Sequence, residues 1–130
     1  MSEFQNTLSV AASAMEAQAM RLRYISENLA NADTPGYHRK AAAFEMEMAR
    51  GGETGRVRLG DVQLDDRALT RIYEPGNPMA DSSGYFDGSN VDMVVEIADA
   101  REAQRSYEAN LKLFDQARQM SQNLLELLRR

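Results

Sequence analysis

The chain has 130 residues, enough for one modest domain, and its 43% hydrophobic and 27% charged residues are typical of a folded protein. Its net charge is −5 and its 15 basic residues are dispersed, which argues against nucleic-acid binding, because that function needs clustered Lys and Arg. The absence of cysteine excludes disulfides, thiol catalysis and cysteine-bound zinc.

The first predicted element is a long helix over roughly residues 3 to 32. Its apolar residues keep a heptad spacing, which places them on one stripe of the helix, as at the seam of a coiled coil. The two sets of heptad positions are Leu8, Met15, Leu22 and Leu29, and Phe4, Ala11, Gln18 and Ile25, of which only Gln18 is polar. We expect Ser2 to cap the start of this helix, and Pro35 and Gly36 to end it.

The middle of the chain, residues 35–90, differs in kind, because it is rich in clusters of Gly, Pro and Ser. Within it, residues 56–59 and 62–64 alternate in polarity on either side of a Gly-Asp pair. Such alternation around a two-residue turn predicts a short β-hairpin. Residues 69–73 are expected to add a third strand.

The last predicted element is a second long helix, from about residue 91 to the end of the chain. Residues 91–130 contain neither Pro nor Gly, and Asp92 is expected to contribute to the cap at the start. Polar residues interrupt the apolar stripe at Gln104 and Arg118. The stripe consists of Met93, Ile97, Ala100, Ala103, Tyr107, Leu111, Phe114, Ala117, Leu124 and Leu128.

These elements predict a mainly α fold, in which two long terminal amphipathic helices pack as a coiled coil around a small irregular middle region with a β-hairpin. The predicted parts are residues 1–34, 35–90 and 91–130. Two helices alone do not enclose a core and leave apolar surface that needs another partner. The periodicity is compatible with a helical hairpin within one chain and with seams between different chains.

No recognisable site for catalysis, a cofactor or a metal ion is present in the sequence. The single histidine, His38, excludes paired-histidine metal sites, and the glycine-rich stretch at residues 51–55 lacks the lysine of a phosphate-binding loop. The acidic residues of the middle region do not have the spacing of a calcium loop. The N-terminus is not of the Sec signal type, and no apolar run approaches the roughly 18 residues of a membrane span.

Residues 28–37, NLANADTPGY, resemble the signature shared by flagellar rod and hook proteins. The surrounding sequence narrows the resemblance to the proximal-rod members of this axial family. The further matching segments are residues 8–15, 38–45, 73–81, 84–85, 90–92 and 105–110. A neighbouring rod protein, another axial or adaptor protein, and an unrelated coiled-coil binding module remain as alternatives.

The resemblance implies a structural subunit of the flagellar rod, which assembles helically through its terminal helices and transmits torque. It implies partners among other copies of the chain, other rod proteins and the flagellar type III export apparatus. It also implies a place in the rod across the periplasm, reached without a cleaved signal peptide. The residues expected at the assembly interface are Phe4, Leu8, Ala11, Met15, Leu22, Ile25, Leu29, Met93, Ile97, Ala100, Tyr107, Leu111, Phe114, Leu124 and Leu128.

The family motif also has a predicted structural role, which is to set the angle between the first helix and the middle region. Asn28 and Asn31 are expected to cap the last helical turn, while Gly36 takes a positive φ and Tyr37 packs its ring at the exit. The motif residues are Asn28, Leu29, Asn31, Thr34, Pro35, Gly36 and Tyr37.

Overall fold

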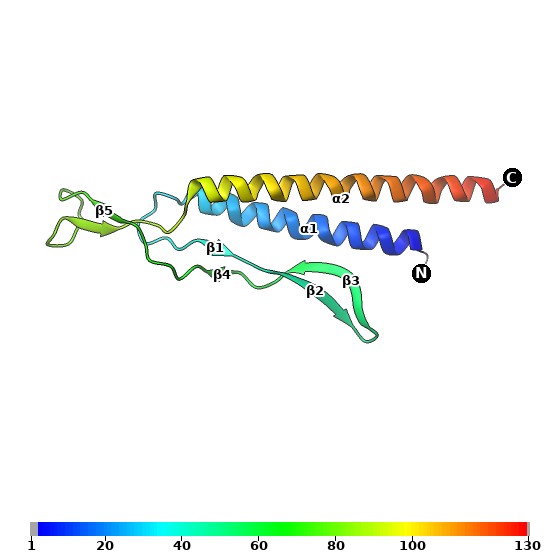
Figure 1. Ribbon diagram of the computed structural model, residues 1–130, viewed down its shortest axis with the longest axis horizontal. Coiled ribbons are helices and arrows are strands. Elements are labelled where there is room, and N and C mark those ends of the chain that lie inside the picture. The colour runs from blue at the N-terminus through cyan, green and yellow to red at the C-terminus, as the bar shows by residue number, and fades with distance from the viewer. Residues whose placement is uncertain (1–2, 130) are drawn as a thin grey trace.

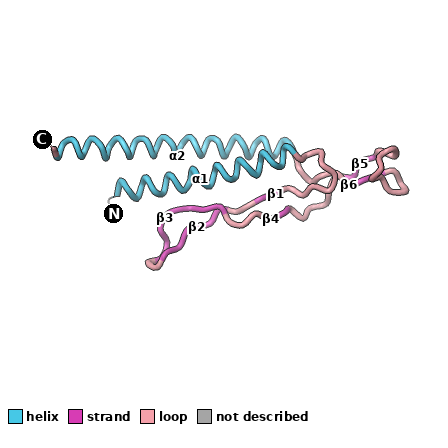
Figure 2. Tube along the Cα trace, turned by 180° about the vertical axis from the view of Figure 1, so that it is seen from behind, coloured by secondary structure: helices cyan, strands magenta, loops and turns pink. Residues whose placement is uncertain are grey.

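The computed structural model describes residues 3–129 and contains two long helices, with three small antiparallel sheets between them in sequence. The helices lie side by side along an elongated molecule, and the strands form a thinner second layer that continues past the end of the helices (Figure 1). Figure 2 shows the same two layers from behind, with loops concentrated where the helices meet the strands. The predicted mainly α class with a small β middle region is confirmed.

Helix α1 (Glu3–Ala30) has 28 residues and ends two residues before the predicted boundary. The turn that follows begins at Asn31, whose backbone N–H still bonds to the carbonyl of Glu27 at 3.1 Å. The expected cap at Ser2 lies outside the described residues.

Helix α2 (Met93–Leu128) has 36 residues and is therefore about 54 Å long at 1.5 Å per residue. Asp92 caps its start, since a carboxylate oxygen accepts hydrogen bonds from the backbone N–H groups of Val94 at 3.0 Å and Val95 at 3.5 Å. Because α2 is longer than α1 and antiparallel to it, its C-terminal end extends past the start of α1 (Figure 1).

The core of the described residues is small and contains few large apolar side chains. Its buried apolar residues are Ala11, Ala17, Ile25, Phe86, Ala103 and Ala117. Alanine side chains allow two helix backbones to approach closely, but they bury little area each. The largest side chains that are fully buried are polar, those of Glu96 and Asn28. A regular coiled-coil geometry for the pair stays a prediction.

Two of the sheets lie along α1. Strand β1 (Lys40–Ala41) pairs with β4 (Gln63–Leu64), and β2 (Phe44–Ala49) pairs with β3 (Gly52–Leu59). The β2–β3 hairpin packs through β3 on the first half of α1, where the backbone N–H of Val57 donates a hydrogen bond to Ser13 Oγ at 3.1 Å.

The predicted hairpin between residues 56–59 and 62–64 is wrong. Residues 56–59 belong to β3, which pairs with β2 instead, and a β-hairpin turn at Gly60 does not form. The backbone N–H of Gly60 bonds to the carbonyl of Ala43 at 2.8 Å, so the chain passes straight from one sheet to the next. A Cβ atom at Gly60 would lie 2.6 Å from a carboxylate oxygen of Glu45, so a larger residue there would displace that half-exposed side chain.

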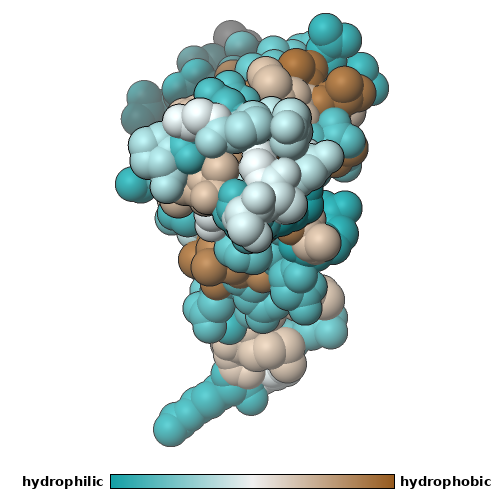
Figure 3. Space-filling view, turned by 90° about the vertical axis from the view of Figure 1, so that its left-hand side faces the viewer, coloured by the Kyte–Doolittle hydropathy of each residue, from teal (hydrophilic) through white to brown (hydrophobic). Residues whose placement is uncertain are grey.

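The third sheet is a hairpin that projects beyond the helices. Strand β5 (Arg71–Tyr73) pairs with β6 (Tyr85–Asp87), and the rings of Tyr73 and Tyr85 pack with their centroids 5.0 Å apart. The third strand expected within residues 69–73 is therefore present, although its partner was not predicted. Seen from this end, the surface is mostly hydrophilic and is interrupted by separate hydrophobic patches (Figure 3).

Candidate assembly site

The turn after α1 is held by side-chain hydrogen bonds. Asn31 caps the last helical turn, because its Nδ2 donates to the carbonyl of Glu27 at 2.8 Å, and Thr34 Oγ1 in turn donates to Asn31 Oδ1 at 3.1 Å. Gly36 has a φ of 76°, which favours glycine. Its backbone N–H bonds to the carbonyls of Asp87 at 3.2 Å and Gly88 at 3.0 Å, so the turn is tied to the end of β6.

Asn28 does not cap the helix as the sequence suggested; it bridges the helix to the chain beyond the turn. Its Nδ2 donates to the carbonyl of Lys40 at 2.9 Å, and its Oδ1 accepts from the backbone N–H of Lys40 at 2.8 Å. The same Oδ1 accepts from the hydroxyl of Tyr37 at 2.8 Å. The buried amide of Asn28 therefore satisfies both backbone groups of Lys40, as a neighbouring strand would do. Burial raises the pKa of the Tyr37 hydroxyl.

An ion pair between the side chains of Lys40 and Glu27 adds a second link between α1 and the start of β1. Lys40 Nζ lies 2.8 Å from a carboxylate oxygen of Glu27, one turn before the end of α1. The hydrogen bond between the two groups lowers the pKa of Glu27 and raises that of Lys40.

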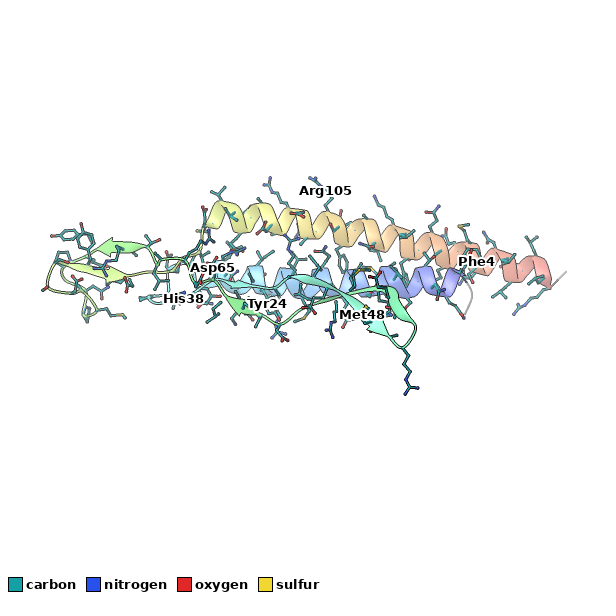
Figure 4. All side chains as sticks on the ribbon, turned by 60° about the horizontal axis from the view of Figure 1, so that its bottom comes forward. Phe4, Tyr24, His38, Met48, Asp65 and Arg105 are labelled. Atoms are coloured by element: carbon teal, nitrogen blue, oxygen red, sulfur yellow. The ribbon has the colours of Figure 1, made fainter. Side chains whose placement is uncertain are left out.

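A cluster of charged side chains lies where the helices meet the β5–β6 hairpin. Arg39 contacts Glu96, Asp99 and Asp65, and the side chain of Glu96 is 0% exposed. Hydrogen bonds from Arg67 lower the pKa of Asp65. Figure 4 labels Asp65 and His38 at this junction, where His38 Nδ1 lies 2.9 Å from the carbonyl oxygen of Asp65.

Helix α2 carries large hydrophobic side chains that the rest of the described chain does not cover, and they gather near its two ends. We call these the N-terminal patch of α2, consisting of Met93, Val94, Val95 and Ile97, and the C-terminal patch of α2, consisting of Met120, Leu124, Leu125, Leu127 and Leu128. Leu111 and Leu113 lie exposed between them. Val94 is 76% exposed and Leu128 is 75% exposed, values typical of polar surface residues. Arg105, in the middle of the helix, points away from the molecule (Figure 4).

The geometry of the described residues offers surfaces for packing and hydrogen-bonding. Among residues 3–129, no group of three or more His, Asp or Glu side chains is placed to hold a metal ion. Over the same described residues, neither helix combines the length and apolar character needed to cross a membrane.

Comparison with known proteins identifies the family. Residues 8–38 match the family described as flagella basal body rod protein, and residues 82–127 match the C-terminal family of flagellar basal body rod FlgEFG proteins. The chain is 40% identical over 127 residues to the flagellar basal-body rod protein FlgC of Agrobacterium fabrum, which covers 92% of this chain and 91% of that protein. It is 38% identical to FlgC of Escherichia coli and 37% identical to FlgC of Salmonella typhimurium, each over 94% of this chain and 96% of the relative.

The chain belongs to the FlgC family of flagellar basal-body rod proteins. It is a structural subunit of the flagellar basal-body rod and not an enzyme. The alternative that the chain is a neighbouring rod protein, which the sequence analysis left open, is therefore not supported. The two matched segments contain most of both helices and the turn, whereas residues 39–81, which include β1 to β5, are matched only by the full-length FlgC relatives.

The structure divides the residues that were expected at the assembly interface of this FlgC-family chain into two groups. Members on α1 and in the middle of α2 are buried or half-buried within the chain itself: Phe4, Leu8, Ala11, Met15, Leu22, Ile25, Leu29, Ala100, Tyr107 and Phe114. Members that remain exposed lie only on α2: Met93, Ile97, Leu111, Leu124 and Leu128. Only the second group offers extensive surface to another subunit in this conformation.

Several residues of the site were not predicted. Val94, Val95, Leu125 and Leu127 belong to the exposed patches, but they lie off the heptad positions that the sequence analysis followed. Neither Arg39 nor its buried partner Glu96 was singled out as a functional residue. The sequence feature that could have drawn attention to Glu96 is its place as an acidic residue in the first turn of α2. An acidic residue there also has an ordinary explanation, because a negative charge is favourable near a helix N-terminus.

Proposed function

We propose that this FlgC-family subunit enters the rod through the N-terminal and C-terminal patches of α2, which pack against other rod subunits and against copies of the same chain. The observation that carries this proposal is the position of the C-terminal patch. Its leucines lie on the part of α2 that extends past α1, where no other described element of the chain covers them.

Burial of these side chains supplies the driving force for such packing. Fully burying an exposed leucine contributes about 1.5–3 kcal/mol, so two or three of them offset much of the cost of ordering a subunit. A patch at one end of a long helix that meets a different surface on the next subunit makes a head-to-tail contact. Contacts of that kind build helical assemblies when the rotation does not close.

In this proposal, α1 has an indirect role, because most of its heptad residues face the rest of the chain. Ala11 and Ile25 are buried and hold α2 in place. A pair of long packed helices along the molecule gives the subunit stiffness, which suits transmission of torque. We further propose that the rod containing this subunit crosses the periplasm, and that the subunit reaches it through the type III export apparatus without a cleaved signal peptide.

The test compares Leu124→Asp/Leu128→Asp with Ala109→Asp, which places a carboxylate on an exposed position in the middle of α2. Each variant replaces the chromosomal copy in a motile bacterium. We expect the double variant to be exported in normal amounts but to yield no basal bodies with a complete rod and no swimming in soft agar, whereas Ala109→Asp swims.

Circular dichroism of the purified chains provides the control for folding. The double variant should retain the helicity of the parent, because its changed residues are exposed. Complete rods and normal swimming with Leu124→Asp/Leu128→Asp would contradict the proposal, and so would an equal defect in both variants.

A further inference from the structure

We propose that Arg39 is a positioning residue, which holds the β5–β6 hairpin in one direction relative to the helix pair. Arg39 lies outside both helices, between the turn and β1. Its Nε donates a hydrogen bond to Glu96, its Nη2 lies 3.3 Å from Asp99 Oδ2, and its Nη1 lies 3.8 Å from Asp65 Oδ2. Two of these carboxylates belong to α2, and the third belongs to the segment that leads out to the hairpin.

The backbone of Arg39 joins the same segments a second time. Its N–H donates to Asn90 Oδ1 at 2.6 Å, and its carbonyl accepts from the N–H of Asp65 at 2.7 Å. Asn90 Nδ2 closes the set by donating to the carbonyl of Asp65 at 2.9 Å. Three stretches of chain, before β1, after β4 and before α2, are thus connected at one residue.

These connections matter because the hairpin is not part of a larger sheet. Among the described residues, strands β5 and β6 pair with each other and with no further strand. The chain enters the hairpin through residues 65–70 and returns through residues 88–92, and both segments are bonded at the Arg39 cluster. The return side is also bonded to the turn after α1, through Gly36, through Ser89 Oγ, which donates to the carbonyl of Ala32, and through the N–H of Asn90, which donates to the carbonyl of Tyr37 at 3.3 Å.

Burial and charge explain why the position requires arginine. The Glu96 side chain is fully buried, and its Oε2 has no hydrogen-bond partner among the described residues. Two further guanidinium groups lie at the cluster, since Arg21 lies 3.6 Å from Asp99 and also 3.6 Å from Glu102, and Arg67 lies 2.7 Å from Asp65. Among the described residues, Arg39 alone contacts Glu96, Asp99 and Asp65 together. A lysine ammonium is a single point charge and does not span them, whereas the planar fork of arginine does.

The experiment measures the direction of the hairpin and not the stability of the fold. The chain has no cysteine, so Ser82→Cys near the hairpin tip and Arg105→Cys on the outer face of α2 allow two specific spin labels. Double electron–electron resonance on the full chain then gives the distribution of distances between the labels. We expect one narrow peak for the parent and loss of that peak, with a broad distribution, for Arg39→Met at unchanged helical circular dichroism.

Arg58→Met is the matched control, since it removes an exposed arginine that pairs with Glu45 in the β2–β3 hairpin, and it should keep the narrow peak. If Arg39→Met fails to fold, Arg39→Met/Glu96→Met removes the unpaired buried charge together with the arginine. The tie to Asp65 is still lost in that double variant, so a broad distribution is expected again.

A narrow, unshifted peak in a folded Arg39 variant would overturn the inference, and so would equal broadening in Arg58→Met. Arg39→Lys should keep the helix content of the parent but should not restore the narrow peak. These outcomes are read on the isolated chain, and they are independent of whether the patches of α2 are the assembly surfaces.

Discussion

The hydroxyl of Tyr37 donates a hydrogen bond to Oδ1 of Asn28 at 2.8 Å, which closes the turn after α1 onto the last part of that helix. The amide of Asn28 is also bonded to both backbone groups of Lys40. One buried side chain therefore fixes the end of the helix, the exit of the turn and the start of β1 together. This arrangement gives the turn a single geometry without a large apolar core beneath it.

Asn28→Ala should lower the free energy of unfolding by about 2–3 kcal/mol, because the polar groups of Lys40 and Tyr37 lose a buried partner. Tyr37→Phe removes only the hydroxyl and should cost about 1 kcal/mol. Urea unfolding followed by circular dichroism measures both values. Asn123→Ala, at an exposed position of α2, is the control and should stay within about 0.5 kcal/mol of the parent. An effect of Asn28→Ala no larger than that of Asn123→Ala would contradict the role given to the amide.

The helices were predictable from sequence because their signals are local. Heptad spacing, the acidic cap at Asp92 and the Pro35-Gly36 pair all act within a few residues of the boundary they define. The role of Asn28 was not predictable in this way. Its partner Lys40 lies 12 residues further on, beyond a turn, so a helix-capping asparagine and a bridging asparagine look alike in sequence.

The prediction of strand pairing was wrong for a related reason, because a local signal does not decide which partner a strand takes. Alternation about Gly60 suggested a hairpin, but the alternation of Phe44, Met46 and Met48 with glutamates marks the true partner of β3. The cross-strand ion pair of Glu45 with Arg58 supports that register at 3.2 Å. Short strands have several possible partners, and the choice depends on contacts that are distant in sequence.

The candidate site was predicted only in part, since periodicity identifies an apolar stripe but not what covers it. Leu124 and Leu128 were expected to contact a neighbour, and they are exposed, as such a contact requires. Ala11 and Ile25 were placed in the same set, but the chain buries them itself. Arg39 and Glu96 are 57 residues apart, and no local pattern connects them.

Gly84→Ala should weaken the β5–β6 hairpin more than Gly36→Ala does. Both glycines have positive φ, 88° and 76°, so both substitutions carry a backbone cost of about 1–2 kcal/mol. A Cβ atom at Gly84 would also lie 2.7 Å from the ring of Tyr73, whereas a Cβ atom at Gly36 meets open space. Amide hydrogen exchange at Glu74, whose N–H bonds to the carbonyl of Gly84 at 2.9 Å, reports the effect. Equal protection of Glu74 in the two variants would show that the steric contact has no influence.

Ala103→Leu tests how closely the described chain packs around the middle of α2. Ala103 is 0% exposed, so three additional carbon atoms force side chains or backbone apart, and we expect a loss of about 1–3 kcal/mol in the free energy of unfolding. Ala109→Leu makes the same change at an exposed position of the same helix and should stay within about 0.5 kcal/mol of the parent. Thermal and urea unfolding of the two variants give the comparison. A neutral Ala103→Leu would indicate that the helices separate easily.

Asp81 should make the β5–β6 hairpin sensitive to acid. Its Oδ1 accepts hydrogen bonds from the hydroxyl and backbone N–H of Ser83 at 2.6 and 2.9 Å, and its Oδ2 accepts from Arg71 at 2.6 Å. These bonds, led by that of the Ser83 hydroxyl, hold the pKa of Asp81 well below its ordinary value. Because the folded pKa lies below the unfolded one, the contribution is complete above the unfolded value of about 3.9 and is lost as the pH falls toward the folded value.

The hairpin should therefore unfold at lower urea concentration as the pH falls from about 5 to about 2, with the ring NMR signals of Tyr73 and Tyr85 as the readout. Asp81→Asn removes the titrating group, so the hairpin of this variant should be weaker near neutral pH and should depend less on pH. Asp61→Asn, at an exposed position before β4, should keep the pH dependence of the parent. The same pH dependence in Asp81→Asn as in the parent would assign the acid sensitivity to other carboxylates, of which Asp65, with its lowered pKa at the Arg39 junction, is the first to examine.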